Sequence, residues 1–338
     1  MKHTIGTICM LLFMLVGIST QAQEHVGLSV EEIEAYPEPN VTPLAINENH
    51  LYDRIYRQVN APLTIHDAPA GNIINELGIG YNFVTLMQPA DGDWAQISAD
   101  RWISAAEMSS SVAISRFTGV LLPEEGLPYT MAWTLRHIRP AEYPGGEQSE
   151  SNPFLYRYTR VNIYAIVDVD GYNWYQVGEN QWVHQFNVAK ILPIERPEEV
   201  NTAKWVSIDL YEQVLIAYEA DTPVFSTLIS SGLPEWSTNE GIFNVYLRRE
   251  RTTMSGAYNQ PDFYYLEEVP WTMFYDGDIA LHGTYWHDGF GYRQSHGCVN
   301  MTITDSRWLY EWSSDVRDFT VEDSPDLAVH VYSSGSYD

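Results

Sequence analysis

The residues best suited to chemistry lie in one segment near the C-terminal end, around Cys298. His296 lies two positions before this cysteine and His282 lies sixteen positions before it. A free thiol with an ordinary pKa near ~8.5 is only partly ionised at neutral pH, so a nucleophilic cysteine needs a nearby imidazole or another positive field. Gly297 lets the backbone approach closely, and successive backbone N–H groups there could stabilise an oxyanion. The segment therefore contains what acyl transfer requires.

Two short stretches carry these residues in a specific motif. Residues 280–286 read Ala-Leu-His-Gly-Thr-Tyr-Trp, and residues 295–301 read Ser-His-Gly-Cys-Val-Asn-Met. This combination resembles the signature of the L,D-transpeptidase (YkuD) family, in which a histidine is followed by Ser/Thr-His-Gly-Cys-x-Asn/Arg. The resemblance covers roughly residues 204–333. It implies a mainly β fold, an L,D-transpeptidase (YkuD-like) β-sandwich with short helices.

The resemblance assigns catalytic roles to five positions. It makes Cys298 the nucleophile and His282 the general base that accepts the thiol proton. The backbone carbonyl of Gly283 would orient the His282 imidazole. His296 would lie close to the thiol and shape the site, and the backbone N–H groups of Gly297 and Cys298 would hold the oxyanion.

Four further residues are expected on the substrate side of the site. The resemblance places Ser295 at the leading Ser/Thr position of the motif and Asn300 at its Asn/Arg position, where it would position the loop or the substrate. Tyr285 and Trp286 are candidates for contact with a glycan or peptide. Packing of these two aromatic side chains in the core is an equally open alternative.

The reaction implied by the resemblance is a two-step acyl transfer on peptidoglycan stem peptides. The thiolate would attack the carbonyl of an L,D-peptide bond and expel a terminal D-amino acid. An amine of a neighbouring stem, or of another wall polymer, would then resolve the thioester. Water as the acceptor would make the protein an L,D-carboxypeptidase. No metal or other cofactor is expected, because nucleophile, base and oxyanion donors suffice.

Three other interpretations compete with this one. His282, His287, His296, Asp288 and Cys298 could ligate a metal ion, but their spacing matches no common zinc pattern. We therefore expect His287 and Asp288 to be solvated residues of an active-site loop. A peptidoglycan hydrolase of the NlpC type is disfavoured, because its nucleophile precedes its histidine in the chain. The third alternative is a non-catalytic cell-wall-binding protein.

The rest of the chain is predicted to consist of small β-rich units. Asp, Gly, Asn and Pro interrupt short β-type runs, and two Trp-containing hairpins are expected at residues 94–103 and 174–183. The region around the first hairpin resembles a bacterial SH3-like domain, a small β-barrel, and the region around the other hairpin resembles a diverged copy of it. The predicted order is an extended leader at 23–54, SH3-like domains at 55–112 and 113–195, a linker at 196–203 and the catalytic domain at 204–333.

The catalytic domain carries its own local signals. A hairpin is expected over residues 205–218, and Thr304 or Asp305 is expected to cap a helix with Trp308 and Trp312 on one face. The SH3-like domains are expected to bind the cell wall. Deleting residues up to Thr202 is therefore expected to reduce wall binding more than it slows turnover of a soluble stem peptide.

Composition and the N-terminal segment limit the compartment and the partners. The formal net charge is -27, which leaves no basic surface for nucleic acid and disfavours docking on anionic lipid. Residues 1–22 are typical of a cleaved signal peptide, so the protein is expected to be exported to the cell wall, periplasm or exterior without stable membrane insertion. Cys9 would leave with that segment, so Cys298 would be the one remaining thiol. Peptidoglycan stem peptides are the expected partners.

Overall fold

The structure, a computed structural model, describes residues 27–90, 92–109, 111–317, 320 and 324–336. The predicted signal peptide, with Cys9, lies outside these residues. Within the described part of the chain, no helix is long and apolar enough to cross a membrane. The fold is mainly β, as the sequence predicted, and the strands of the described residues form five sheets.

The first sheet of the predicted catalytic domain has seven strands. Trp205 and Tyr218 lie opposite each other in the predicted hairpin, which the structure confirms. Side chains of the strand at residues 204–209 alternate between the two faces of the sheet. Val206 and Ile208 pack in the core on one face, and Trp205 packs in the core on the other. In sheet order the strands are β1 (Thr42–Pro43), β8 (Val120–Leu121), β17 (Thr222–Leu228), β16 (Val214–Glu219), β15 (Lys204–Asp209), β23 (Ala328–Tyr332) and β18 (Gly241–Asn244).

A second sheet packs against the first and completes a sandwich. Val206 and Leu215 of the first sheet share one apolar core with Met273, Leu281 and Val299 of the second. Its strands in order are β2 (Ile55–Val59), β5 (Tyr81–Leu86), β20 (Tyr264–Asp276), β21 (Ile279–Thr284) and β22 (Val299–Thr302), with β19 (Leu247–Gly256) also paired to β20. Burial of this shared core on both sheets provides the main driving force for the sandwich.

The helix α3 (Ile303–Trp312) begins earlier than predicted. Its N-cap is Thr302, not Thr304 or Asp305, because Thr302 ends β22 in an extended conformation and its hydroxyl accepts a hydrogen bond from the Asp305 N–H. The buried Asp305 carboxylate instead accepts from the Thr227 hydroxyl at 2.7 Å and from the Gly119 N–H at 2.9 Å. Trp308 and Trp312 lie on one face of the helix, as predicted, and their rings stack on each other.

Two smaller units precede the sandwich in sequence. The first has a four-stranded sheet, and its β6–β7 hairpin is the one predicted around Trp94. In sheet order its strands are β4 (Ile73–Leu77), β3 (Leu63–His66), β7 (Arg101–Ser104) and β6 (Trp94–Ser98), followed by the short η1 helix (Ala105–Glu107). The remaining strands of this region, β2 and β5, belong to the second sheet of the sandwich.

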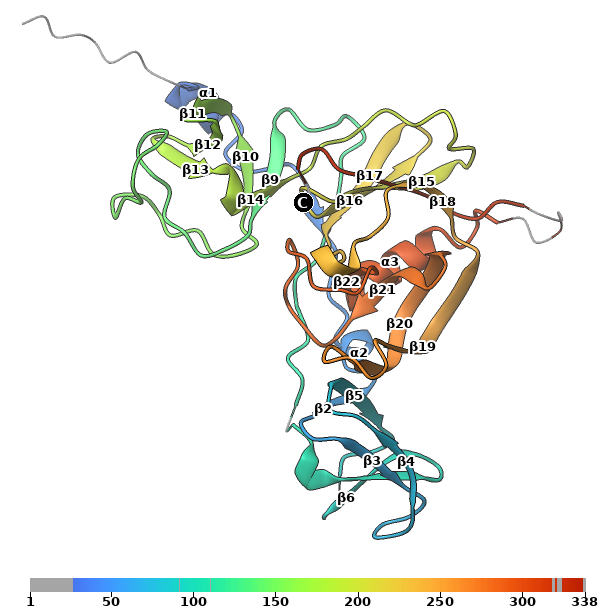
Figure 1. Ribbon diagram of the computed structural model, residues 1–338. Coiled ribbons are helices and arrows are strands. Elements are labelled where there is room, and N and C mark those ends of the chain that lie inside the picture. The colour runs from blue at the N-terminus through green and yellow to red at the C-terminus, as the bar shows by residue number, and fades with distance from the viewer. Residues whose placement is uncertain (1–26, 91, 110, 318–319, 321–323, 337–338) are drawn as a thin grey trace, which may run out of the picture.

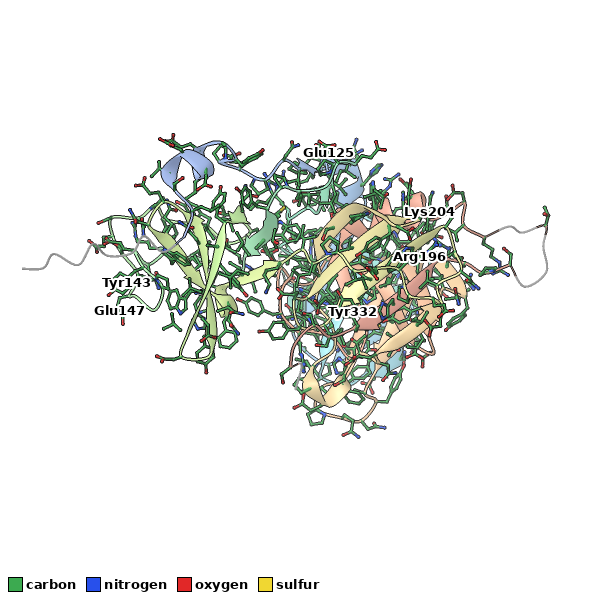
Figure 2. The ribbon with its side chains drawn as sticks, turned by 90° about the horizontal axis from the view of Figure 1, so that it is seen from above. Glu125, Tyr143, Glu147, Arg196, Lys204 and Tyr332 are labelled. Carbon is green, nitrogen blue, oxygen red and sulfur yellow. The ribbon has the colours of Figure 1, made fainter. Side chains whose placement is uncertain are left out.

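The second unit contains two three-stranded sheets, and its β12–β13 hairpin is the one predicted around Trp174. The strands are β10 (Arg160–Ile163), β9 (Thr130–Thr134) and β14 (Val188–Lys190) in one sheet, and β11 (Ala165–Val169), β12 (Tyr172–Gly178) and β13 (Gln181–His184) in the other, followed by η2 (Gln185–Asn187). Tyr143 and Glu147 mark the outer edge of this unit in Figure 2, away from Lys204 of the sandwich.

The leader contains two short helices, and the predicted linker has a residue buried in the core. The leader contains α1 (Val30–Glu34) and α2 (Glu48–Leu51) within otherwise extended chain, and η3 (Pro234–Trp236) lies in the sandwich. Val200 of the linker is buried with Trp205 and Trp133. Figure 1 shows β3, β4 and β6 of the first unit below the sandwich and the second unit, with β9–β14, beside it. Met131 and Trp133 of the second unit share an apolar core with Trp205 of the sandwich, and β5 pairs with β20, so both regions before the sandwich contact it directly.

Candidate active site

A pocket of about 320 Å³ opens beside the ends of β21 and β22. Six of the predicted site residues line it: His282, Trp286, Ser295, His296, Cys298 and Asn300. The other lining residues are Tyr81, Met254, Asp262, Tyr264, Leu266, His287 and Gln294. The motif residues that were separated in sequence therefore meet at one hollow.

Strand pairing explains why these residues meet. The parallel strands β21 and β22 place His282 opposite Asn300, and Cys298 directly precedes β22. The Cys298 Sγ atom lies 3.7 Å from the carbonyl oxygen of Asp278, just before β21. Adjacent parallel strands thus deliver the thiol and the imidazole to the same edge of the sheet.

Both groups are electrically neutral near pH 7. Burial of the Cys298 sulfur, opposed by the hydrogen bond from the Ala280 backbone, raises the pKa of the thiol to about 11. Burial lowers the pKa of His282 to about 4, against the effect of its hydrogen bond with Gly283. The His282 Nδ1 atom lies 3.1 Å from the Gly283 carbonyl, which can only accept, so Nδ1 carries the proton. Nε2 is then the free acceptor, as a general base requires.

The Cys298 thiol and the His282 imidazole line the same pocket without a direct hydrogen bond between them. Among the hydrogen bonds of the described residues, none links Cys298 to His282, and the thiol faces the Asp278 carbonyl instead. Hydrogen bonds of this kind are often long or absent without substrate and tighten in the reactive complex. We therefore expect the contact between the Cys298 thiol and His282 Nε2 to form when substrate binds.

The conformation of the loop before Cys298 shows that the predicted role of the Gly297 N–H as an oxyanion donor is wrong. The Gly297 N–H donates to the Ser295 hydroxyl at 3.1 Å, so it is engaged within the loop and does not face an incoming oxyanion. Ser295 in turn donates to the Cys298 carbonyl, and Thr238 donates to the Gly297 carbonyl at 2.8 Å. Gly297 has a φ of 112°, a conformation that favours glycine. Of the two predicted oxyanion donors, the Cys298 N–H remains.

His296 is held by a carboxylate that the sequence reasoning missed. Its Nε2 atom lies 3.0 Å from Asp262 Oδ2, which also accepts from Trp236 Nε1 at 2.9 Å, and the Tyr264 ring lies beside it. Burial alone would raise the pKa of Asp262, but the hydrogen bonds from His296 and Trp236 lower it overall. Asp262 belongs to the connection between β19 and β20, so no local sequence signal links it to the motif.

His287 is not the solvated residue that the sequence predicted. It is half-buried and lines the pocket; the Gly289 N–H donates to its Nδ1 at 2.9 Å, and the Asn300 amide lies 2.9 Å from its Nε2. Since Nδ1 accepts, a neutral ring carries its proton on Nε2. The Asn300 amide oxygen, which otherwise has no partner among the described residues, therefore belongs opposite Nε2.

Two other residues considered from the sequence, Tyr285 and Asp288, do not line the pocket. Tyr285 does not line the pocket: it is fully buried, stacks on Tyr56 at 3.6 Å between ring centres, and donates to the Glu267 carbonyl at 2.6 Å. It is a core residue because it faces inward at the end of β21. Asp288 is exposed, but it accepts a hydrogen bond from Ser115 and pairs with Arg157, so it anchors its loop to an earlier part of the chain.

Burial of His287 predicts a pH-dependent stability. Burial and the neighbouring His282 and Arg157 lower its pKa to about 3. The unfolded chain binds a proton near pH ~6.5 while the folded chain does not, so stability is full above that pH and is lost as pH falls toward 3. A single such group contributes a slope of up to about 1.4 kcal/mol per pH unit.

The measurement is urea denaturation at several pH values between 4 and 7. His287→Gln should show a shallower loss of unfolding free energy than the wild type toward low pH. His50→Gln, in α2 and outside the pocket, controls for removal of an imidazole elsewhere. Equal slopes for wild type and His287→Gln would show that His287 takes up protons freely in the folded state.

Metal binding has no support in the geometry. Among the described residues, no group of three or more His, Cys, Asp or Glu side chains is arranged to hold a metal ion. The pocket instead presents a thiol, a neutral imidazole and a histidine–carboxylate pair. This set suits covalent acyl transfer.

Comparison with known proteins agrees with the motif. Residues 203–322 match the model of the YkuD family, the L,D-transpeptidase catalytic domain. YciB of Bacillus subtilis (strain 168), whose name describes it as a candidate L,D-transpeptidase, is 26% identical over 130 residues. The match covers 35% of this chain and 64% of YciB, so the chain spans less than two thirds of that relative.

Two solved structures are also similar. An L,D-transpeptidase from Stackebrandtia nassauensis is 24% identical with a TM-score of 0.31, over 42% of this chain and 60% of that one. The catalytic domain of the E. faecium L,D-transpeptidase is 24% identical with a TM-score of 0.32, over 40% of this chain and 100% of that one. By the match to the family model, residues 203–322 of this chain belong to the YkuD family of L,D-transpeptidase catalytic domains.

Proposed function

We propose that the protein is a peptidoglycan L,D-transpeptidase in which Cys298 is the nucleophile and His282 is the general base. The observation that supports this most strongly is the meeting of Cys298, His282 and His296 in one pocket, with Nε2 of His282 unprotonated and free to accept. A neutral thiol beside a neutral imidazole can pass a proton without an initial ion pair.

The first half-reaction forms a thioester. The Cys298 thiol passes its proton to His282 Nε2 as sulfur attacks the carbonyl carbon of an L,D-peptide bond in a stem peptide. The oxygen becomes an oxyanion next to the Cys298 N–H. When the C–N bond breaks, His282 returns the proton to the leaving amine, and a D-amino acid departs.

The second half-reaction transfers the acyl group. An amine of a neighbouring stem or of another wall polymer attacks the thioester, His282 takes its proton, and the thiol is restored as the amide forms. The charged residues favour an amine acceptor: Asp262 is a carboxylate in the pocket wall, and no Lys or Arg lines the pocket among the described residues. Hydrolysis by water, the L,D-carboxypeptidase reaction, is the alternative outcome.

Export and wall contact complete the proposal. The signal-like segment at residues 1–22 supports secretion to the compartment in which peptidoglycan is assembled. The sequence resemblance of the two accessory units to SH3-like domains supports a role near the wall. Mass spectrometry of the products from a defined tetrapeptide-stem muropeptide, with an amine acceptor present, would distinguish cross-linking, hydrolysis and amino-acid exchange. Absence of a thioester on Cys298 and of all three products would overturn the proposal.

Removing the proposed base tests the role of His282 directly. His282→Gln should slow thioester formation by about 10³-fold, within the usual range for loss of a general base. The rate is read as the mass increase of the intact protein over time. His50→Gln should retain the wild-type rate, and acylation by His282→Gln at the wild-type rate would reassign the base.

A further inference from the structure

The first accessory unit extends the catalytic sheet. Its strand β5 pairs in parallel with β20, with Tyr81 opposite Tyr264 and Phe83 opposite Leu266. The Tyr81 N–H donates to the Phe263 carbonyl at 2.8 Å. An SH3-like unit that sat on a flexible tether would not share a hydrogen-bonded sheet with the catalytic domain.

Local sequence makes this close approach possible. A Cβ atom on Gly80 would lie 2.3 Å from the Phe263 carbonyl oxygen, so the backbone contact requires glycine at this position. Beneath the strand, the Phe83 ring packs edge-on against Tyr285 at the end of β21. The position of Tyr81 is thus set by the backbone on one side and by buried aromatic packing on the other.

The Tyr81 side chain reaches the pocket that holds the nucleophile. Its hydroxyl donates to the Trp286 carbonyl at 3.0 Å, and its ring packs edge-on against Phe83. Even so, Tyr81 is 42% exposed, and it lines the same pocket as Cys298. A fixed ring with an open face is well suited to contact a ligand, because little conformational entropy is lost on binding.

The side chains around Tyr81 indicate which part of a substrate it would contact. Met254, Leu266 and Trp286 line the pocket with it, whereas Asp262 and His296 provide the polar side. We propose that Tyr81 is a specificity-determining residue, contributed by the first accessory unit, which packs against the aliphatic part of the stem peptide bound for acyl transfer. This inference rests on the proposed function.

The test separates binding of the stem peptide from reactivity of the thiol. Tyr81→Ala should raise the KM for acylation by a tetrapeptide-stem muropeptide about 10-fold, the scale expected for loss of an apolar contact, with a much smaller change in kcat. Alkylation of Cys298 by iodoacetamide, a probe too small to need the pocket wall, should proceed at the wild-type rate.

Two further variants control for structure. Tyr81→Phe keeps the ring and removes the hydroxyl, so its KM should lie closer to the wild type than that of Tyr81→Ala. Ile79→Ala changes a neighbour that is 75% exposed and outside the pocket, and should leave KM unchanged.

Three outcomes would overturn the inference. A wild-type KM in Tyr81→Ala would remove Tyr81 from substrate recognition. Equal slowing of acylation and alkylation in Tyr81→Ala would assign it a purely structural role. Failure of the wild-type protein itself to form a thioester would overturn the proposed function, and this inference with it. The wild-type protein is therefore assayed first, so that this failure is distinguished from an effect of the Tyr81 variants.

Discussion

Cys298→Ala is expected to eliminate thioester formation and product release, reducing turnover by about 10³-fold or more, as loss of a covalent nucleophile does in other enzymes. The variant should still fold. Cys298 is half-buried, and the hydrogen bond from its thiol to the Asp278 carbonyl, at 3.7 Å, is long and weak. Loss of one sulfur should change the free energy of unfolding by no more than about 1 kcal/mol.

Intact-protein mass spectrometry with the tetrapeptide-stem muropeptide would measure acylation, and urea denaturation would measure stability. Ile79→Ala is a matched control for a single substitution outside the pocket. Retained acylation in Cys298→Ala would place the covalent bond elsewhere. An inactive variant that also lost cooperative unfolding would identify Cys298 as a structural residue, contrary to its position on the pocket wall.

The sequence predicted the part of the site that depends on local order. Cys298 and Asn300 are separated by one residue, and a parallel neighbour carries His282 to the same edge, so one motif describes most of the pocket. Asp262 lies 34 residues from His296 and meets it only through the fold of the β19–β20 connection. The Gly297 N–H could not be assigned from sequence either, because its partner depends on the loop conformation.

In the accessory regions too, local patterns predicted the hairpins but not the contacts between distant segments. Alternating Trp and aliphatic residues predicted both hairpins, since a half-buried strand has a period of two. The alternation of residue types did not predict which strand β5 would pair with. Its pairing with β20 depends on an available sheet edge and on Gly80, whose small size has no consequence until Phe263 lies next to it.

Packing between units also changes the expected result of truncation. The sequence suggested that deleting residues up to Thr202 would mainly weaken wall binding. In the structure, Trp205 of the interior strand β15 is fully buried in one apolar core with Met131, Trp133 and Phe117 of the accessory region. The accessory strand β8 also pairs with β17 of the catalytic sheet.

A chain that starts at Ala203 should therefore fail to fold cooperatively. Each buried aromatic side chain covers roughly 150–250 Å² of surface. At about 25 cal/mol per Å², exposing several of them costs more than about 10 kcal/mol, which is comparable to the total stability of a domain. Thermal denaturation followed by circular dichroism would detect the loss of a cooperative transition. A chain starting at Gly27 is the matched control and should unfold like the full chain.

The same truncation distinguishes a fused catalytic unit from a tethered one. If residues 203–338 unfolded cooperatively and were acylated with the wild-type kcat/KM, the sandwich would be self-sufficient and the accessory units would serve only attachment to the wall. We expect the opposite result, because β5 supplies a strand and Tyr81 a pocket wall, while Ser115 and Arg157 hold the loop that carries His287. Removing these groups takes away part of the substrate site as well as part of the core, so restoring solubility alone would not restore turnover.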